Sequence, residues 1–180
     1  MKLASPLDGI VADLRADRDR LRRAVERVPA PRREWRPGAD RWSVAEILEH
    51  LVIVETRAAT IVRELAATAP AIAGTSSRSE PMVFDRTVLR DRSQRIMAPA
   101  PIQPTGRMSA ADAWAALEQS RVALLAAVRE AEGREMSAVS RTHPRLGLLN
   151  GYEWIAALGG HEERHAAQIE EIAELAGTTE

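Results

Sequence analysis

Apolar residues recur every three or four positions in four long stretches of the chain, and this spacing predicts four amphipathic helices. We expect the first helix from near Pro6 to Val28 and the second from Ser43 to about Ala67. The third should run from Ser109 to about Glu132, and the last from Asn150 to Gly177. Four such helices, with no comparable strand pattern, predict an all-α four-helix bundle.

Three of the predicted helices begin with a capping pattern. Ser43-Val44-Ala45-Glu46 reads as a capping box, in which Ser43 caps the first turn and Glu46 returns a bond to it. Ser109 with Asp112, and Asn150 with Glu153, have the same three-residue spacing. These pairs place the helix starts more firmly than periodicity alone does.

Proline and glycine mark the connections between the helices. Residues 29–40 form the first connector, and Gly133 to Leu149 form the last. The stretch from Thr68 to Met108 is rich in proline and has no sustained period. An irregular crossover of roughly forty residues is unusual inside a compact domain. We therefore expect it to hold a short helix around Val83 to Ile96 or to cover a functional site.

Length and composition fit one domain over residues 1–180. The chain is 45% hydrophobic but only 3% aromatic, so its core is built largely of aliphatic side chains and alanine, as in helix bundles. The net charge is −1, with both signs interleaved, which argues against a dedicated nucleic-acid surface. We expect a small-molecule substrate rather than a nucleic-acid partner, and the sequence leaves a homodimer open.

The location is predicted from what the chain lacks. It contains no cysteine, which fits a reducing compartment. Residues 1–10 have no apolar run of the signal-peptide kind, and no eighteen apolar residues stand in a row. These features predict a soluble cytoplasmic protein without a membrane partner.

Two histidines near the C-terminus carry the clearest chemical signal. His161 and His165 are four residues apart, so their imidazoles lie about one turn apart on one helix face. The same stripe holds the apolar residues of the last helix: Trp154, Leu158, Ile169 and Ile172. Because an inward imidazole needs a polar partner, a divalent metal ion that binds both rings explains their shared face.

A third histidine lies in a similar setting on the second predicted helix. His50 is three residues after Ile47 and four before Val54, which places it on the apolar side. Three inward histidines on two helices can form a three-nitrogen site with coordination positions left open, which is typical of catalytic metal sites. Zinc, nickel, manganese and iron are all compatible with imidazole and water ligands.

Three motifs in this order resemble those of the DinB/YfiT-like family. They are Arg41-Trp42-Ser43-Val44-Ala45-Glu46-Ile47-Leu48-Glu49-His50-Leu51, then His143-Pro144-Arg145-Leu146-Gly147, then His161-x-x-x-His165. The resemblance extends from about Leu7 to Ala176. It implies a four-helix bundle with a metal held by one histidine of the second helix and two of the last, which correspond here to His50, His161 and His165.

The resemblance also suggests classes of activity. The family includes metal-dependent thiol S-transferases, a maleylpyruvate isomerase and hydrolase-like proteins. It therefore implies a transferase or hydrolase that acts on small molecules, with a low-molecular-weight thiol as a candidate co-substrate.

The residues His161-Glu162-x-x-His165 also spell the zinc metalloprotease motif, with Glu162 as the general base. Three observations weigh against a protease. Few residues follow His165 for a third ligand, the glycine of the extended motif is absent, and no upstream segment reads as a substrate-binding edge strand. Glu162 stays a candidate base beside the metal, because its position is about 60° around the helix from His165.

Other polar residues near these motifs have more than one interpretation. His143 precedes a proline and is expected to be a loop contact near the mouth of the site rather than a ligand. Glu46 and Glu55 either orient His50 or lie on the helix surface. Arg121 interrupts an apolar face of the third predicted helix. It either holds a substrate carboxylate or, as we favour, extends its aliphatic stem past the core so that its charged group reaches solvent.

The leading hypothesis is a metal-dependent enzyme in which the ion lowers the pKa of a bound water or thiol. Its rival is a non-enzymatic or metal-free bundle whose crossover has closed the site. A pocket that reaches the three histidines favours the enzyme. Side chains of residues 68–108 that plug the site favour the rival.

Overall fold

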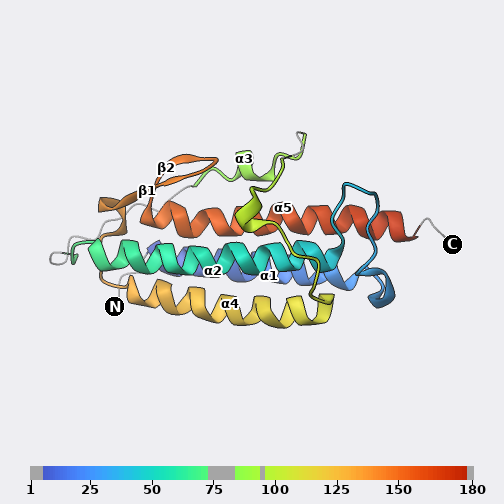
Figure 1. Cartoon of the computed structure of the whole chain (residues 1–180). Coiled ribbons are helices and arrows are strands. Elements are labelled where there is room, and N and C mark those ends of the chain that lie inside the picture. Colours follow the sequence, from blue (N-terminus) through green and yellow to red (C-terminus); the bar gives the residue numbers. More distant parts are fainter. Residues whose placement is uncertain (1–5, 73–83, 94–95, 178–180) are drawn as a thin grey trace.

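Four long helices lie side by side and form the body of the molecule (Figure 1). A computed structural model describes residues 6–72, 84–93 and 96–177. The long helices are α1 (Pro6–Glu26), α2 (Val44–Thr68), α4 (Ala110–Glu130) and α5 (Gly151–Gly177). The shorter elements are the 3-10 turns η1 (Ala30–Arg32), η2 (Ala100–Ile102) and η3 (Met136–Ala138), the helix α3 (Thr87–Arg90), and the strands β1 (Ser140–His143) and β2 (Gly147–Asn150). The predicted all-α four-helix bundle is confirmed.

The predicted caps explain where the long helices begin. At α2, the Ser43 hydroxyl accepts a bond from the Glu46 amide while the Glu46 carboxylate accepts one from the Ser43 amide. Ser109 accepts from the Asp112 amide at the start of α4. Asn150 and Glu153 bond reciprocally at the start of α5, at 2.7 and 3.0 Å.

The directions of the helices explain the long crossover. Figure 1 shows that α1 and α5 run one way along the bundle and that α2 and α4 run the other way. Because α2 ends where α4 also ends, the chain must return along the whole bundle before α4 can begin. The described part of the return path, residues 84–93 and 96–108, passes over α5 and contains α3, a single turn within the range predicted for a short helix. Residues 83, 94 and 95 of that range lie outside the described residues.

Two adjacent glycines in α5 permit close packing beside the histidine pair. A Cβ atom on Gly160 would lie 2.8 Å from the Leu89 side chain of α3. A Cβ atom on Gly159 would overlap the carboxylate of Asp17 from α1. Both neighbours can approach only because these residues have no side chain, although glycine inside a helix costs about 1 kcal/mol.

The segment before α5 forms a β-hairpin, where only a connector was predicted. Strands β1 and β2 pair antiparallel, from Ser140 opposite Asn150 to His143 opposite Gly147. The strands are mostly exposed, so they lack the alternation of apolar and polar residues that would have indicated them. Trp154 of α5 donates its indole N–H to the Arg141 carbonyl at 2.9 Å, which attaches the hairpin to the bundle.

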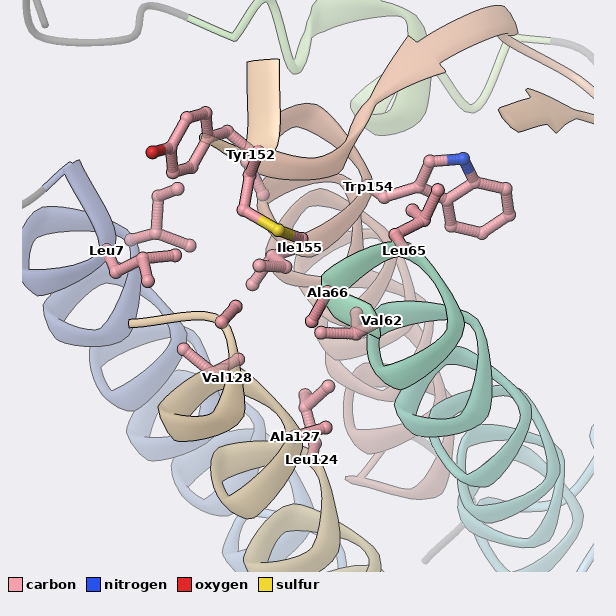
Figure 2. Close-up of a cluster of buried hydrophobic side chains, with 14 of the residues drawn as sticks. Leu7, Val62, Leu65, Ala66, Leu124, Ala127, Val128, Tyr152, Trp154 and Ile155 are labelled. Atoms are coloured by element: carbon pink, nitrogen blue, oxygen red, sulfur yellow. The ribbon is translucent and has the colours of Figure 1, made fainter. Parts of the chain in front are cut away.

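The hydrophobic core consists of two clusters that follow each other along the bundle. One cluster draws on all four long helices and is shown in Figure 2; it includes Leu14, Val62, Leu124 and Ile155. The other includes Leu21, Leu48, Leu117 and Ile169.

Among the described residues, no helix is long and apolar enough to cross a membrane.

A layer of four buried charged residues, one from each long helix, stands between the two clusters. Arg18 of α1 and Arg121 of α4 each donate to both Glu55 of α2 and Glu162 of α5. The Ser120 hydroxyl also donates to Glu55. All four charged residues are at most 8% exposed, so each charge is compensated by opposite charges inside the bundle. We call this set the charged layer.

The charged layer corrects two interpretations from the sequence. Arg121 does not pass the core with its head in solvent, because its guanidinium is buried and ion-paired. Glu55 neither orients His50 nor lies on the surface, because both its oxygens accept from arginines.

Candidate metal centre

His50, His161 and His165 converge at one point between α2 and α5. The Nε2 atom of His161 lies 3.2 Å from the Nε2 atoms of both His50 and His165. One ligand atom from each of the three lies within 4.8 Å of the others. Two nitrogens bound to one zinc ion at 2.0–2.1 Å in tetrahedral geometry lie about 3.3 Å apart, so the observed spacing suits a shared ion.

Two of the three rings are held by a hydrogen bond at Nδ1. His50 donates to the carbonyl oxygen of Ile102 in η2 at 2.6 Å, and His165 donates to Oε1 of Gln168 at 3.0 Å. A neutral imidazole that donates from Nδ1 has its lone pair on Nε2. The Nε2 atoms of His50 and His165 therefore both present lone pairs to the convergence point. Hydrogen bonds at the far nitrogen are the usual way in which proteins orient metal-binding histidines.

A metal ion satisfies this arrangement better than protons do. If His161 carries a proton on Nε2, that proton can point well at only one of its two neighbours. A divalent ion accepts all three lone pairs together, and the chain supplies no cysteine to close the coordination shell. The three residues thus fit an open three-nitrogen site.

The surroundings of the histidines favour the neutral rings that bind metals. Burial lowers the pKa of His50 below its usual value and the pKa of His165 well below it. Removal from water, followed by repulsion from His50, lowers the pKa of His161 to about 3. Trp42 forms one wall, with its ring centroid 5.0 Å from that of His50 and 6.5 Å from that of His165.

These pKa values predict that the chelator-treated protein loses stability in acid. Between the folded-state pKa of His161, about 3, and the unfolded-state value of about 6.5, only the unfolded chain takes up the proton. The free energy of unfolding therefore falls as the pH falls through this window. Asp17 acts in the opposite sense, because burial raises its pKa to about 6, but three histidines outweigh one carboxyl. Thermal unfolding after EDTA treatment should give a lower Tm at pH 5 than at pH 7. A Tm that does not change, or rises, would contradict the lowered values.

The crossover is anchored next to His50 by a buried carboxylate. Glu49 accepts bonds from the amide and hydroxyl of Thr105 and from the amide of Gly106, at 2.6 to 3.0 Å. This anchor fixes the chain that follows η2 and so holds the Ile102 carbonyl against His50. Glu46, the other neighbour considered for that role, bonds instead to Ser43 and to the guanidinium of Arg36. The interpretation that Glu46 orients His50 is therefore wrong.

A pocket of about 560 Å³ is lined by His165, one of the three histidines. Its lining includes Trp42, His165 and Gln168 from the two ligand-bearing sides, and Met97 and Gln103 from the crossover. The described crossover residues thus form a wall of this pocket without filling it. This is the arrangement expected for a site that small molecules can reach.

Glu162 is held away from the role of a general base. Its two carboxylate oxygens accept from Arg18 and Arg121 in the charged layer. It also lines a separate cavity of about 10 Å³ next to His161, which is about the size of one water molecule. Both oxygens of this carboxylate are therefore already occupied as hydrogen-bond acceptors.

His143 is a hairpin contact and does not belong to the three-histidine cluster. Its Nδ1 atom accepts from the amides of Arg145 and Leu146, at 3.2 Å each. Its ring lies 4.9 Å from that of Trp154. It therefore stabilises the turn of the hairpin, in the role of a loop contact.

The fold and the site together define a class: helical bundles with a candidate metal centre of one histidine from the second long helix and two from the last. Comparison with known families agrees. The model of the DinB superfamily matches residues 13–169, and the chain belongs to this family.

One curated relative is the uncharacterized protein YuaE of Bacillus subtilis (strain 168). It is 29% identical over 140 residues, which cover 77% of this chain and 82% of the relative. No solved structure matches the chain significantly.

Proposed function

We propose that this protein binds one divalent metal ion through His50, His161 and His165 and acts as a metal-dependent enzyme on small molecules. The observation that carries the proposal is the convergence of three imidazole nitrogens beside an accessible pocket. The proposed chemistry is that of a thiol S-transferase or a related hydrolase. When bound, the ion lowers the pKa of a thiol or water so that the nucleophile forms near neutral pH.

Other residues of the chain orient the candidate ligands and shape the site around them. Ile102 and Gln168 hold His50 and His165 with their lone pairs facing inward. Trp42 shields one side of the site from water, and the pocket beside His165 admits the substrate. No general base is assigned, because both oxygens of Glu162 accept from guanidiniums. This arrangement supports a nucleophile that would be activated by the ion, and it does not support one that Glu162 would activate.

The proposal is tested by elemental analysis of protein purified without a metal-affinity step, followed by a thiol-transfer screen. We expect about one zinc, nickel, manganese or iron ion per chain, and transfer of a low-molecular-weight thiol to an electrophile that stops after EDTA treatment. A protein that neither contains nor takes up a divalent ion would contradict the metal site. Metal-loaded protein without transfer or hydrolysis would support the rival, a non-enzymatic metal-binding bundle.

A further inference from the structure

The last part of the crossover is bound to α2 by the carboxylate of Glu49, which directly precedes His50. Two consecutive amides donate to this carboxylate, that of Thr105 to Oε1 at 3.0 Å and that of Gly106 to Oε2 at 2.9 Å. The Thr105 hydroxyl adds a third bond to Oε1 at 2.6 Å. Glu49 is only 5% exposed, and hydrogen bonds to an ionised carboxylate are about twice as strong as those between neutral groups. We call these three bonds the Glu49 clamp.

The chain between the clamp and the hydrogen bond to His50 is short and stiff. The 3-10 turn η2 contains Pro101, and Pro99 and Pro104 stand on either side of it. Each proline fixes its φ angle near −65°. The amide of Ile102 also bonds back to the Pro99 carbonyl at 3.0 Å. The Ile102 carbonyl that accepts from His50 is therefore held in place by a clamp only a few residues further along the chain.

The same piece of the crossover forms part of the pocket wall. Met97, Ala98 and Gln103 all line the pocket beside His165. The side-chain amide of Gln103 donates to the Ala98 carbonyl at 2.8 Å, which joins the two ends of this wall. One short segment thus orients a candidate metal ligand and shapes the space into which a substrate would enter.

We propose that Glu49 is a positioning residue of the metal centre, and that a bound ion in turn fixes the pocket wall in place. The inference rests on the metal site of the proposed function. Glu49 acts through the crossover, because its clamp keeps the Ile102 carbonyl against Nδ1 of His50 and so keeps the lone pair on Nε2 facing the other histidines.

The coupling between the ion and the wall works in both directions. If closure of the crossover on α2 raises the affinity for the ion by some factor, the ion must favour closure by the same factor. The ion therefore does more than activate a nucleophile. It also completes the wall of the pocket before a substrate binds.

The first arm of the test measures zinc affinity by competition with a chromophoric chelator. Glu49→Gln removes the charge of the clamp and should weaken zinc binding about 10–100-fold, as is usual for groups that orient metal ligands. Glu46→Gln is the matched control. It makes the same change at another carboxylate of α2 that is 5% exposed, but Glu46 bonds to Ser43 and Arg36 and not to the crossover. Its zinc affinity should stay unchanged, even where stability is lost.

A second pair of variants changes the clamp from the crossover side, at an exposed residue where folding is not at risk. Thr105→Val removes the hydroxyl donor and keeps the shape of the side chain, whereas Thr105→Ser keeps the donor. Thr105→Val should weaken zinc binding by about three- to tenfold, less than loss of the carboxylate does. Thr105→Ser should bind zinc like the wild type.

The second arm measures the reverse effect by amide hydrogen exchange, which a purely structural role of Glu49 would leave unchanged by zinc. The Thr105 and Gly106 amides should exchange more slowly in zinc-loaded than in EDTA-treated protein, by a factor similar to the affinity loss in Glu49→Gln. The Ile72 amide, which bonds to the Gly133 carbonyl at the far end of α2, is the control and should exchange equally in both forms.

The outcomes separate this inference from the proposed function. If the wild type binds zinc, and Glu49→Gln binds it equally well or no better than Glu46→Gln does, Glu49 is not a positioning residue. Clamp amides that exchange equally with and without zinc would overturn the coupling. A wild-type protein that binds none of zinc, nickel, manganese and iron would refute the metal site, and the inference together with it.

Discussion

Replacing His161 by alanine is expected to lower the affinity for the divalent ion by well over tenfold while leaving the helical content intact. His161 lies between the other two rings, at 3.2 Å from each, so its loss removes the central ligand of three. Substitutions that only disturb the groups behind metal ligands already cost about 10–100-fold in affinity, and loss of a ligand itself costs more. The bundle has two hydrophobic clusters of its own, so its folding does not depend on the ion as that of a zinc finger does.

Mass spectrometry of metal content and circular dichroism measure the two halves of this prediction. His143→Ala is the matched control, because it removes a histidine outside the three-histidine cluster and should keep the ion. His50→Ala and His165→Ala should behave like His161→Ala. Full metal occupancy in His50→Ala would instead indicate a two-histidine site of the protease type, and full occupancy in all three variants would refute the assignment.

Glu162→Gln is expected to destabilise the fold by about 3–5 kcal/mol, the usual cost of removing one partner from a buried ion pair. The substitution leaves Arg18 and Arg121 with Glu55 as their shared buried carboxylate. Urea unfolding measures the change. Glu118→Gln is the control: this carboxylate also pairs with Arg18, but its side chain is 44% exposed, so less than about 1 kcal/mol should be lost.

A double variant distinguishes the effect of an unpaired buried charge from the effect of a lost side-chain contact. Adding Arg121→Met to Glu162→Gln restores neutrality, because Arg18 and Glu55 remain as one ion pair. The double variant should be more stable than Glu162→Gln alone, since no unpaired charge is left. If Glu162→Gln is as stable as the wild type, the charged layer does not hold the bundle together. If it folds, keeps its metal and loses thiol transfer, Glu162 acts in catalysis after all.

Most of the fold could be predicted from the periodicity of apolar residues and from the capping residues of the helices. The apolar stripes and the reciprocal pairs at Ser43 and Asn150 were local signals, and local signals survive in a single sequence. The histidine pair was equally local, since four-residue spacing fixes the relative position of two side chains on a helix. His50 could be added because it lies on an apolar stripe.

The parts that sequence reasoning missed depend on partners far along the chain. The acceptor that orients His50 is a backbone carbonyl 52 residues away, which leaves no residue-type signal. The arginines that line the pocket come from the connector before α2, from the crossover and from α5, so no motif unites them. The charged layer did have a signal. Arg18 lies between Leu14 and Leu21 on one stripe, as Arg121 lies between Leu117 and Leu124 on another, but a charge alone is usually read as solvent-facing.

The charged layer has a consequence for how the helices can slide against one another. Moving one helix along its neighbour by a turn, about 5.4 Å, would set a guanidinium or carboxylate against leucine and isoleucine and leave its partner unpaired. Sliding is therefore penalised far more than in a purely aliphatic bundle, where one layer resembles the next. Glu162 directly follows His161, and Glu55 lies five residues after His50 on the same helix. The ion pairs of the charged layer fix the axial alignment of α2 and α5. They therefore also fix the position along the helix axes at which the histidines of these two helices meet.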